Sequence, residues 1–360
     1  MLVEPCKFEC LEPLSLASGR ELPGFTLAYE TYGQLTPARD NAILVCHALS
    51  ANAHAAGRHR PDDARPGWWD AAIGPGRMLD TDRYFVVCSN ALGGNAGSSG
   101  PSSSDPHTGR PYGLRFPVVS VADMVAAQIH LADHLSVARW HAVVGGCLGG
   151  AQALTWLQHH PDRVGRVVAV GITAATSAHT IAFFEVMRQA VRLDPRWRGG
   201  DYYGHEPPDG GLGLSVMLGM LFWMTPAMMT EKFGRALVGD DYRYTLESEF
   251  RIERQLAALA EGGVRHLDAN TMLYLTRAYE YFDLARGYPN LREALREAVA
   301  PTLLVSYTTD WRYAPERVEE LAQALPRARH LTLDSPFGHG AYLIDPVPLA
   351  IPVRDFLEEV

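Results

Sequence analysis

The sequence predicts an α/β protein in which helices flank a mostly parallel sheet and a helical cap is inserted into that core. Short β-branched runs alternate with loops and helical patterns in the first half of the chain, as in folds built from βαβ units. Strand signals almost vanish over residues 177–297, where long helical patterns dominate, and they resume near residue 302. We therefore expect a core of residues 1–176, a cap of residues 177–297, and completion of the core by residues 298–360.

The expected strands are short runs rich in valine, isoleucine and leucine. In chain order they cover residues 42–46, 84–88, 142–144, 167–170, 302–307 and 330–333. Between the second and third of these runs, residues 121–135 place apolar side chains at helical spacing, which predicts a helix that crosses over one face of the sheet.

The composition is that of an ordinary folded protein and excludes several classes of partner. The chain has 360 residues, of which 47% are hydrophobic and 20% charged, and its formal net charge is −9. Nucleic acids and anionic membranes require basic surfaces, so we expect neither as a partner. The N-terminal residues show no secretion signal, and no run of about eighteen apolar residues occurs, which makes the cytoplasm the expected location.

The cysteines and histidines give no sign of a disulfide framework or a metal site. Five cysteines are an odd number, and Cys6 and Cys10 lack a second pair at metal-ligand spacing. His130 and His134 lie four residues apart on one expected helix, but no third ligand accompanies them. We expect no metal and no permanently bound cofactor.

The strongest functional signal is the segment Gly145-Gly146-Cys147-Leu148-Gly149. It follows an expected strand and leads into a helical pattern, which matches the nucleophile elbow G-x-S-x-G of the α/β-hydrolase fold with cysteine in the serine position. Glycines flank the nucleophile because the turn is sharp, and side chains there would collide with the strand or helix. The nucleophile then lies at a helix N-terminus, where the partial positive charge favours a thiolate.

Two other interpretations of this segment are weaker. A glycine-rich turn after a strand also begins dinucleotide-binding sites, but these carry an acidic residue about 20 positions further on. The next strand, RVVAVGITA, ends without one. Alternatively, Cys147 is a small buried hydrophobic residue, which is the commoner role of a lone cysteine. The residues that follow in the chain favour the elbow.

An acid and a histidine follow the nucleophile in the order that this fold uses. Asp310 comes after the expected strand 302–307, and His339 lies in a glycine-flanked loop after the last expected strand. We expect Asp310 to orient the imidazole of His339, which transfers protons to and from the reacting groups. Asp334 is the alternative acid, but it directly adjoins the strand that must deliver the histidine.

An oxyanion hole requires two backbone N–H groups that point at the developing negative charge. One is expected from Leu148, immediately after the nucleophile. The other is expected from the loop HALS after the strand 42–46, where Leu49 is the best candidate. We expect His47, beside this loop, to support the loop rather than to act as a base.

Long segments over nearly the whole chain carry a family resemblance. They include NAILVCHALS, PGWWDAAIGPGRMLDTDRYFVVCSNALGG, SSGPSSSDPHTGRPYG, VVGGCLGGAQAL, DPRWRGGDY and DANTMLYLTRAYEYFDL. In this order they resemble the homoserine O-acetyltransferase family of α/β-hydrolase-fold acyltransferases. The resemblance implies a ping-pong reaction: acyl-CoA, with acetyl-CoA as the expected co-substrate, acylates the nucleophile, CoA leaves, and an acceptor hydroxyl takes the acyl group. It assigns the triad to Cys147, Asp310 and His339, and it implies a homodimer formed through the cap.

The chain departs from this family at the nucleophile and around the acceptor. The family's usual serine is Cys147 here, and Gly340 replaces the aspartate that typically follows the catalytic histidine. In the cap, Val216 and Trp223 occupy the positions of the family's arginine and tyrosine. Without these groups the ammonium and carboxylate of homoserine lose their partners, at a cost of about several kcal/mol. We therefore expect a CoA-dependent O-acyltransferase that moves a short acyl group through acyl-Cys147 to a small acceptor other than homoserine.

Two alternatives remain open. The chain is a true homoserine O-acetyltransferase of methionine biosynthesis if other groups hold the amino acid. It is an ester or thioester hydrolase if water takes the place of the acceptor. In each case the acyl group passes through Cys147.

Overall fold

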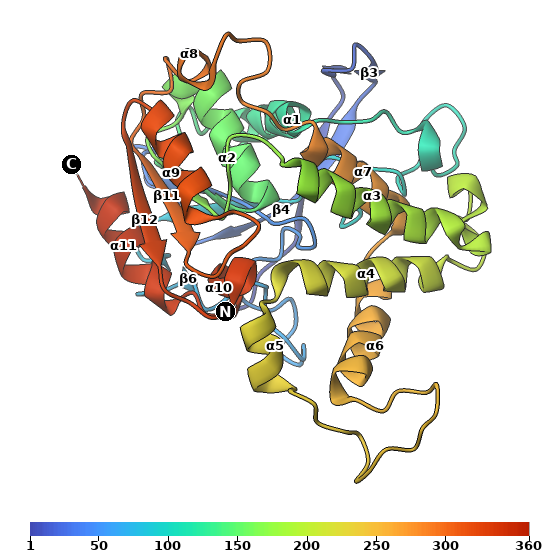
Figure 1. The fold of residues 1–360 in the computed structure, drawn as a ribbon. Helices are drawn as coiled ribbons and strands as arrows, with labels where there is room; N and C mark the ends of the chain where they lie inside the picture. Colours follow the sequence, from blue (N-terminus) through green and yellow to red (C-terminus); the bar gives the residue numbers. More distant parts are fainter. Residues whose placement is uncertain (360) are drawn as a thin grey trace.

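The computed structural model describes residues 1–359 and has the predicted α/β-hydrolase fold, an eight-stranded and mostly parallel sheet with helices on both faces (Figure 1). The strand order is β1-β4-β8-β5-β9-β10-β11-β12. The pairs β1–β4 and β4–β8 are antiparallel, and all other neighbours in this sheet are parallel. The bounds are Cys6–Cys10 (β1), Phe25–Tyr32 (β4), Ala42–Cys46 (β5), Phe85–Ser89 (β8), Ala142–Gly146 (β9), Val167–Val170 (β10), Thr302–Tyr307 (β11) and Ala328–Leu333 (β12).

The remaining elements are two small strand pairs and the helices. The strand pairs are Leu14–Ser15 (β2) with Glu21–Leu22 (β3), and Ile73–Gly74 (β6) with Leu79–Asp80 (β7). The core helices are Val121–His134 (α1), Leu148–His159 (α2), Pro315–Ala324 (α9), Ala341–Ile344 (α10) and Val347–Glu358 (α11). Between β10 and β11 lie Ala178–Leu193 (α3), Asp209–Trp223 (α4), Pro226–Lys232 (α5), Arg251–Val264 (α6), Ala269–Glu280 (α7) and Leu291–Ala294 (α8).

The predicted strands are present with small shifts at their ends, but the sheet also has an edge that the sequence analysis missed. Strands β1 and β4 form an antiparallel pair beside β8. Their sequences, CKFEC and FTLAYETY, interleave charged and polar residues with apolar ones. This alternation is typical of a strand with one solvated face, and it lacks the continuous apolar run of the central strands.

Both faces of the central sheet are buried, which is why its strands read as apolar runs. On one face, Val143 and Leu304 belong to a core that includes side chains of α1 and α2. On the other face, Val144 and Val305 pack in a second core with Phe356 of α11. Each fully buried side chain of this kind contributes about 1.5–3 kcal/mol relative to an exposed one. The strand ends that carry the candidate site are thus held from two sides.

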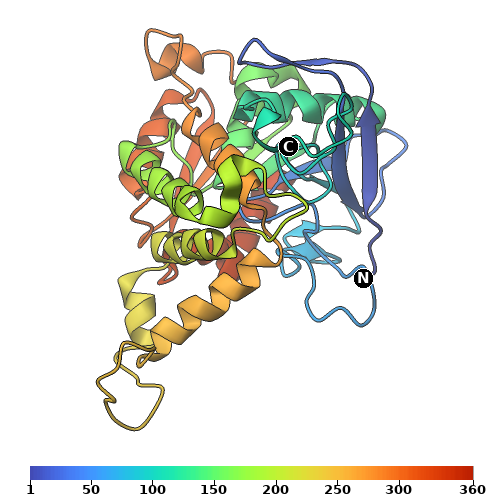
Figure 2. The same cartoon turned by 90° about the vertical axis from the view of Figure 1, so that its right-hand side faces the viewer.

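The helices α3 to α8 occupy the residues expected to form the cap. Helix α3 packs against α4 and α7, and α4 packs against α6. Figures 1 and 2 show these helices beside the sheet, with the segment between α5 and α6 reaching away from the rest of the protein. Within residues 1–359, no single helix is long and apolar enough to cross a membrane. Helices α4 and α5 reach that length only as a pair bent by 104°.

The turn from β9 into α2 depends on glycines that let backbone segments approach closely. A Cβ atom on Gly149 would lie 1.9 Å from the backbone oxygen of Cys46 on β5. One on Gly145 would lie 2.4 Å from the backbone of Gly149, and one on Gly146 would lie 2.6 Å from the ring of Tyr342. Because backbone atoms cannot rotate away as a side chain can, the first two positions accept no side chain without a shift of the strand or helix.

Replacement of Gly149 by alanine is expected to lower the free energy of unfolding by about 3 kcal/mol or more, because the new methyl group collides with the backbone of β5. The matched control is Gly262→Ala in α6, where a Cβ atom would meet nothing within 4 Å. That change should be neutral or stabilising by up to about 1 kcal/mol, since alanine is the better helix former. Urea denaturation followed by circular dichroism measures both. Equal midpoints for Gly149→Ala and the unmodified chain would contradict this account of the turn.

Candidate active site

Cys147 lies in the turn between β9 and α2, at the carboxyl edge of the sheet. Its backbone has φ 57° and ψ −122°, a conformation that costs a residue with a side chain about 1–3 kcal/mol. The packing of the flanking glycines maintains it. The side chain is only 4% exposed, yet it lines an internal cavity. The first turn of α2 begins directly after it, where the helix dipole favours a negative charge.

Asp310 and His339 meet at the same edge of the sheet. The Nδ1–H group of His339 donates to Oδ2 of Asp310 at 2.9 Å, and both side chains are buried. The other carboxylate oxygen of Asp310 accepts the backbone N–H groups of Arg312 and Tyr313, each at 3.0 Å. These bonds fix the acid, and the acid fixes the imidazole so that Nε2 is left for chemistry. No hydrogen-bond partner for Nε2 is present within residues 1–359.

The alternative acid, Asp334, lies elsewhere. Its Oδ1 atom accepts the hydroxyl of Thr308 at 2.7 Å on the protein surface. His339 donates its hydrogen bond to Asp310 instead. The preference for Asp310 in the sequence analysis therefore agrees with this geometry.

The charges of the three groups depend on one another. Burial by itself raises the pKa of Cys147, but the positive charges of Arg312 and His339 and the N–H of Leu148 outweigh it and lower the pKa to about 6. Burial alone lowers the pKa of His339, but Asp310 and Cys147 raise it to about 9. For Asp310, burial is outweighed mainly by His339, and its pKa is lowered. At neutral pH the arrangement therefore favours a thiolate, an imidazolium and a carboxylate.

Arg312 is the functional residue that the sequence analysis missed. Its Nη1 atom lies 3.9 Å from Sγ of Cys147, and its buried Nε and Nη2 atoms have no hydrogen-bond partner within residues 1–359. The guanidinium carbon lies 4.2 Å from the ring centre of Phe222 and 4.8 Å from that of Tyr313. Such aromatic faces stabilise a buried cation. The available signal was its position two residues after the predicted acid, in a loop at the carboxyl end of a strand.

The two expected oxyanion residues lie beside Cys147. The N–H group of Leu148 is close enough to the sulfur to favour its negative form, and Leu49 lines the same cavity. His47 supports the loop that contains Leu49, because its Nε2 atom accepts the N–H of Ala91 at 2.9 Å. Burial lowers the pKa of His47 to about 4, so it stays neutral in this bond.

The cavity above Cys147 has a volume of about 230 Å³. The structure places all three expected acceptor-pocket residues, Val216, Trp223 and Gly340, along its wall. The ring of Trp223 fills the space where a side chain at position 340 would lie, since a Cβ atom on Gly340 would come within 2.4 Å of it. This wall is apolar, as the sequence suggested. Arg312 also lines the cavity and brings a positive charge to it.

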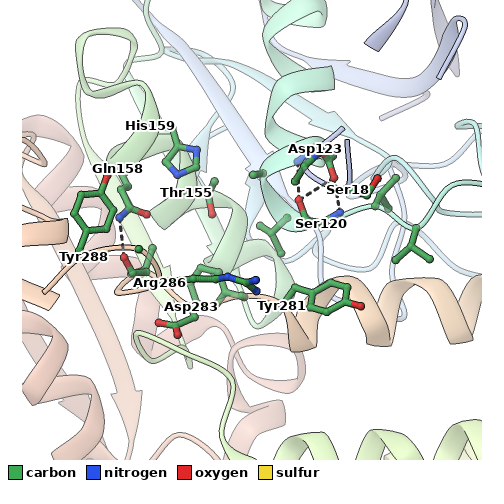
Figure 3. Close-up of a pocket in the computed structure, with 18 residues that line it drawn as sticks. Ser18, Ser120, Asp123, Thr155, Gln158, His159, Tyr281, Asp283, Arg286 and Tyr288 are labelled. Carbon is green, nitrogen blue, oxygen red and sulfur yellow. Dashed lines mark hydrogen bonds between the residues drawn. The ribbon is translucent and has the colours of Figure 1, made fainter. Parts of the chain in front are cut away.

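A larger hollow, of about 700 Å³, lies at the opposite end of α2 (Figure 3). Its lining includes Thr155 and His159 from the last turns of α2, and Arg286 and Tyr288 from the segment after α7. It contains none of the three triad residues. We therefore place the candidate active site at the smaller cavity.

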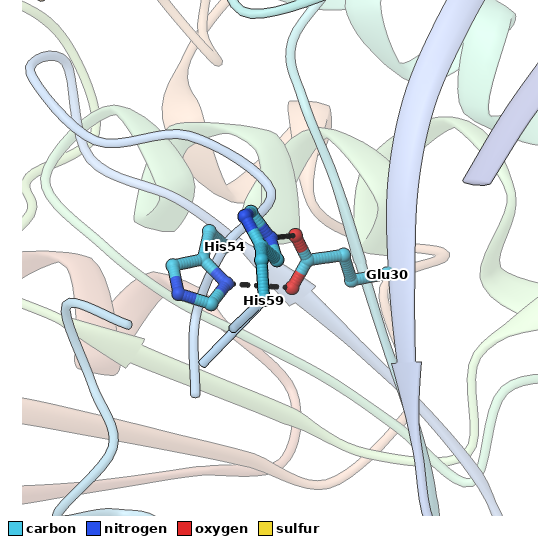
Figure 4. A group of neighbouring side chains, drawn as sticks. All are labelled: Glu30, His54 and His59. Atoms are coloured by element: carbon cyan, nitrogen blue, oxygen red, sulfur yellow. Dashed lines mark hydrogen bonds and ion pairs between the residues drawn. The ribbon is translucent and has the colours of Figure 1, made fainter. Parts of the chain in front are cut away.

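One group of side chains has the composition of a metal site. Possible ligand atoms of Glu30, His54 and His59 lie within 4.8 Å of one another (Figure 4). His54 Nδ1–H and His59 Nε2–H donate to separate oxygens of the Glu30 carboxylate, at 2.9 and 2.7 Å. The hydroxyl of Tyr32 donates to the same carboxylate at 2.8 Å. These bonds satisfy the buried acid and fasten the loop that follows Leu49 to β4.

Comparison with known proteins supports the fold and the resemblance. Residues 41–346 match the family model of the alpha/beta hydrolase fold. The chain is 48% identical to the homoserine O-succinyltransferase of Pseudomonas syringae pv. tomato, over 96% of this chain and 93% of that protein. The crystal structure of homoserine O-acetyltransferase from Bacillus anthracis matches with a TM-score of 0.93 and 31% identity, covering 100% of this chain and 98% of that one.

A solved structure named as a hydrolase is also similar. The crystal structure of esterase E22 matches with a TM-score of 0.91 and 31% identity, and covers 99% of this chain and 100% of that one. The similarity to the transferases nevertheless includes a relative that is almost half identical over nearly the full length. The chain therefore belongs to the homoserine O-acetyltransferase family, a group of acyltransferases with the α/β-hydrolase fold.

Proposed function

We propose that this chain is a homoserine O-succinyltransferase that works by a ping-pong mechanism through a thioester on Cys147. The names of its relatives support homoserine as the acceptor, and they lend no support to the different acceptor expected from Gly340, Val216 and Trp223. The observation that carries the proposal is the guanidinium of Arg312 beside the nucleophile, whose buried Nε and Nη2 atoms have no hydrogen-bond partner within residues 1–359. It favours an acyl group that ends in a carboxylate.

In the first half-reaction, the thiolate of Cys147 attacks the thioester carbonyl of the acyl-CoA. The N–H groups of Leu49 and Leu148 hold the oxyanion. The tetrahedral intermediate then expels the CoA sulfur, which takes the proton of the His339 imidazolium. One thioester replaces another, so this step is nearly balanced in free energy and the acyl group stays activated.

In the second half-reaction, neutral His339 takes the proton from the acceptor hydroxyl as its oxygen attacks acyl-Cys147. Collapse of the intermediate releases the ester and returns the thiolate, which is again paired with the imidazolium. Asp310 keeps the imidazole in the tautomer that exposes Nε2 to the acceptor.

Arg312 distinguishes a succinyl group from an acetyl group. Before acylation, its charge is balanced locally by the thiolate of Cys147. Acylation removes that negative charge, and the CoA thiol leaves with the positive charge of the His339 proton, so Arg312 then faces the carboxylate of Asp310 without the thiolate. A succinyl group brings its own carboxylate, which can accept charge-assisted hydrogen bonds from the Nε and Nη2 atoms that lack partners.

The acceptor side of the cavity offers homoserine few polar groups. Ser215 has a buried hydroxyl without a hydrogen-bond partner within residues 1–359, and Ser50 also lines the cavity. No aspartate or glutamate is among the lining residues. Because an ammonium group is held best by a carboxylate, we expect weak binding of homoserine, with a KM of about 1 mM or above.

Hydrolysis is the second candidate function. It is favoured by the similarity to esterase E22 and by the apolar wall of Trp223 and Gly340, which offers the amino acid no charge. In this case water takes the place of the acceptor in the second half-reaction. The two functions share the acyl-Cys147 intermediate and differ only in what discharges it.

Intact-protein mass spectrometry after mixing with succinyl-CoA separates the two functions. We expect one succinyl adduct, absent from Cys147→Ala, that persists in buffer and disappears when homoserine is added. Rapid loss in buffer alone would identify a hydrolase. Faster discharge by an uncharged alcohol than by homoserine would exclude homoserine as the preferred acceptor.

Arg312→Met is expected to change the choice of donor. The methionine keeps an extended side chain but removes the charge, so kcat/KM with succinyl-CoA should fall at least about thirtyfold more than kcat/KM with acetyl-CoA. The ratio of the two donors is the readout, because any effect on the Cys147 thiolate reduces both rates. Arg317→Met, which removes an exposed arginine paired with Glu320, is the control and should leave the ratio unchanged. An unchanged ratio in Arg312→Met would remove the basis for a succinyl donor.

We also propose a homodimer formed through the cap, as the family resemblance implies. The segment between α5 and α6 exposes Tyr244 and Leu246, which are 92% and 109% exposed, and the ring centre of Tyr242 lies 6.1 Å from that of Tyr244. Large apolar side chains in a projecting segment are typical of an interface. Sedimentation velocity should show a dimer that Leu246→Glu weakens, and a monomer at all concentrations would contradict the proposal.

A further inference from the structure

The sulfur of Cys147 has two properties that would also allow a reaction other than acyl transfer. It is 4% exposed and lines a cavity of about 230 Å³, which is large enough for small molecules. Arg312 and His339 line the same cavity, and Nη1 of Arg312 lies 3.9 Å from the sulfur. Three buried nitrogen atoms of these two side chains, Nε and Nη2 of Arg312 and Nε2 of His339, have no hydrogen-bond partner within residues 1–359. Such a site suits a small molecule in which the thiolate can attack one atom while the group bonded to that atom leaves as an anion. The unpaired donors can stabilise the anion as it leaves.

We propose that Cys147 is an oxidation site for hydrogen peroxide, whose reaction stops acyl transfer reversibly. The thiolate attacks one peroxide oxygen, the O–O bond breaks, and a sulfenic acid forms. The departing hydroxide takes the proton of the His339 imidazolium and leaves as water. Sulfur is thereby oxidised by two electrons and peroxide is reduced by two, so no further reactant is required.

Arg312 assists this step through geometry. Its Nη1 atom lies 3.9 Å from the sulfur, so a peroxide molecule bound by the guanidinium has an oxygen within reach of Sγ. The unpaired Nε and Nη2 atoms are free to stabilise the negative charge that develops on the departing oxygen. His339, which is neutral after this step, can take the proton of the sulfenic acid, and the same guanidinium then faces the resulting sulfenate anion as it faced the thiolate.

The other cysteines are not placed to convert the sulfenic acid into an internal disulfide. Cys6 and Cys10 lie on β1, and three strands separate β1 from β9. Cys46 and Cys88 are fully buried, and burial raises the pKa of Cys46 to about 12, so its thiolate is scarce. The oxidised state therefore persists until a small thiol enters the cavity. That thiol condenses with the sulfenic acid to a mixed disulfide and water, and a second thiol molecule releases Cys147.

The inference requires Cys147 to be an accessible nucleophile, but it is independent of which acyl group or acceptor the enzyme uses. Acylation should protect the sulfur, because the thioester has no thiolate to oxidise. Sulfenic acid can be measured directly on the protein. A failed transferase assay and a failed oxidation assay are therefore distinguishable.

The test treats the full chain with a small excess of hydrogen peroxide and dimedone, which traps sulfenic acid, and follows peptide masses over time. We expect Cys147 to be trapped well before the more exposed Cys6, and prior treatment with succinyl-CoA to slow the reaction at least tenfold. Arg312→Met should react at least tenfold more slowly than the unmodified chain, and Arg317→Met at the same rate.

Two results would overturn the proposed oxidation, and a third would overturn its reversibility. One is trapping of Cys6 ahead of Cys147 in the unmodified chain, which needs no variant to fold. The other is an Arg312→Met protein that folds and is oxidised as fast as the unmodified chain. In the expected outcome, a small thiol such as glutathione restores the original mass of the Cys147 peptide, and failure to restore it would show that the modification is not reversible.

Discussion

The site depends on the attraction between the sulfur of Cys147 and two cations, the imidazolium of His339 and the guanidinium of Arg312. Burial alone disfavours a thiolate, so without these charges the nucleophile would be an ordinary protonated thiol. The cations in turn depend on groups behind them. Asp310 holds His339, and aromatic rings surround Arg312. The proposed acyl transfer and the proposed oxidation both follow from this arrangement of charges.

The fold brings these charges together by placing the ends of three parallel strands at one edge of the sheet. Cys147 follows β9, Asp310 follows β11, and His339 follows β12. The nucleophile occupies a strained conformation, and the packing of Gly145 and Gly149 against neighbouring backbone maintains it. The two apolar cores on either side of the sheet supply the stability that this strain requires.

Much of the fold, and the meeting of Cys147, Asp310 and His339 at one edge of the sheet, could be predicted because they depend on local patterns. The elbow is a contiguous segment in which the sharp turn requires glycines on both sides of the nucleophile. The acid and the histidine follow it in a fixed order at strand ends. The strands β1 and β4 could not be found from continuous apolar runs, because polar residues alternate with apolar ones in both and one face of each is less buried than the other. Arg312 could not be recognised because an arginine in a loop is usually solvated, and only the folded cap encloses it beneath Phe222. The same limit explains why Val216, Trp223 and Gly340 could be expected around one cavity while the charge that Arg312 brings to it could not.

The most direct test of the charge arrangement is the pH dependence of Cys147 alkylation by iodoacetamide, with the modified peptide quantified by mass spectrometry. The reaction rate follows the thiolate fraction. We predict that the rate reaches half its plateau near pH 6, and that His339→Gln and Arg312→Met each move this midpoint upward. A rate that continues to rise through pH 9, as for an unperturbed thiol, would contradict the account.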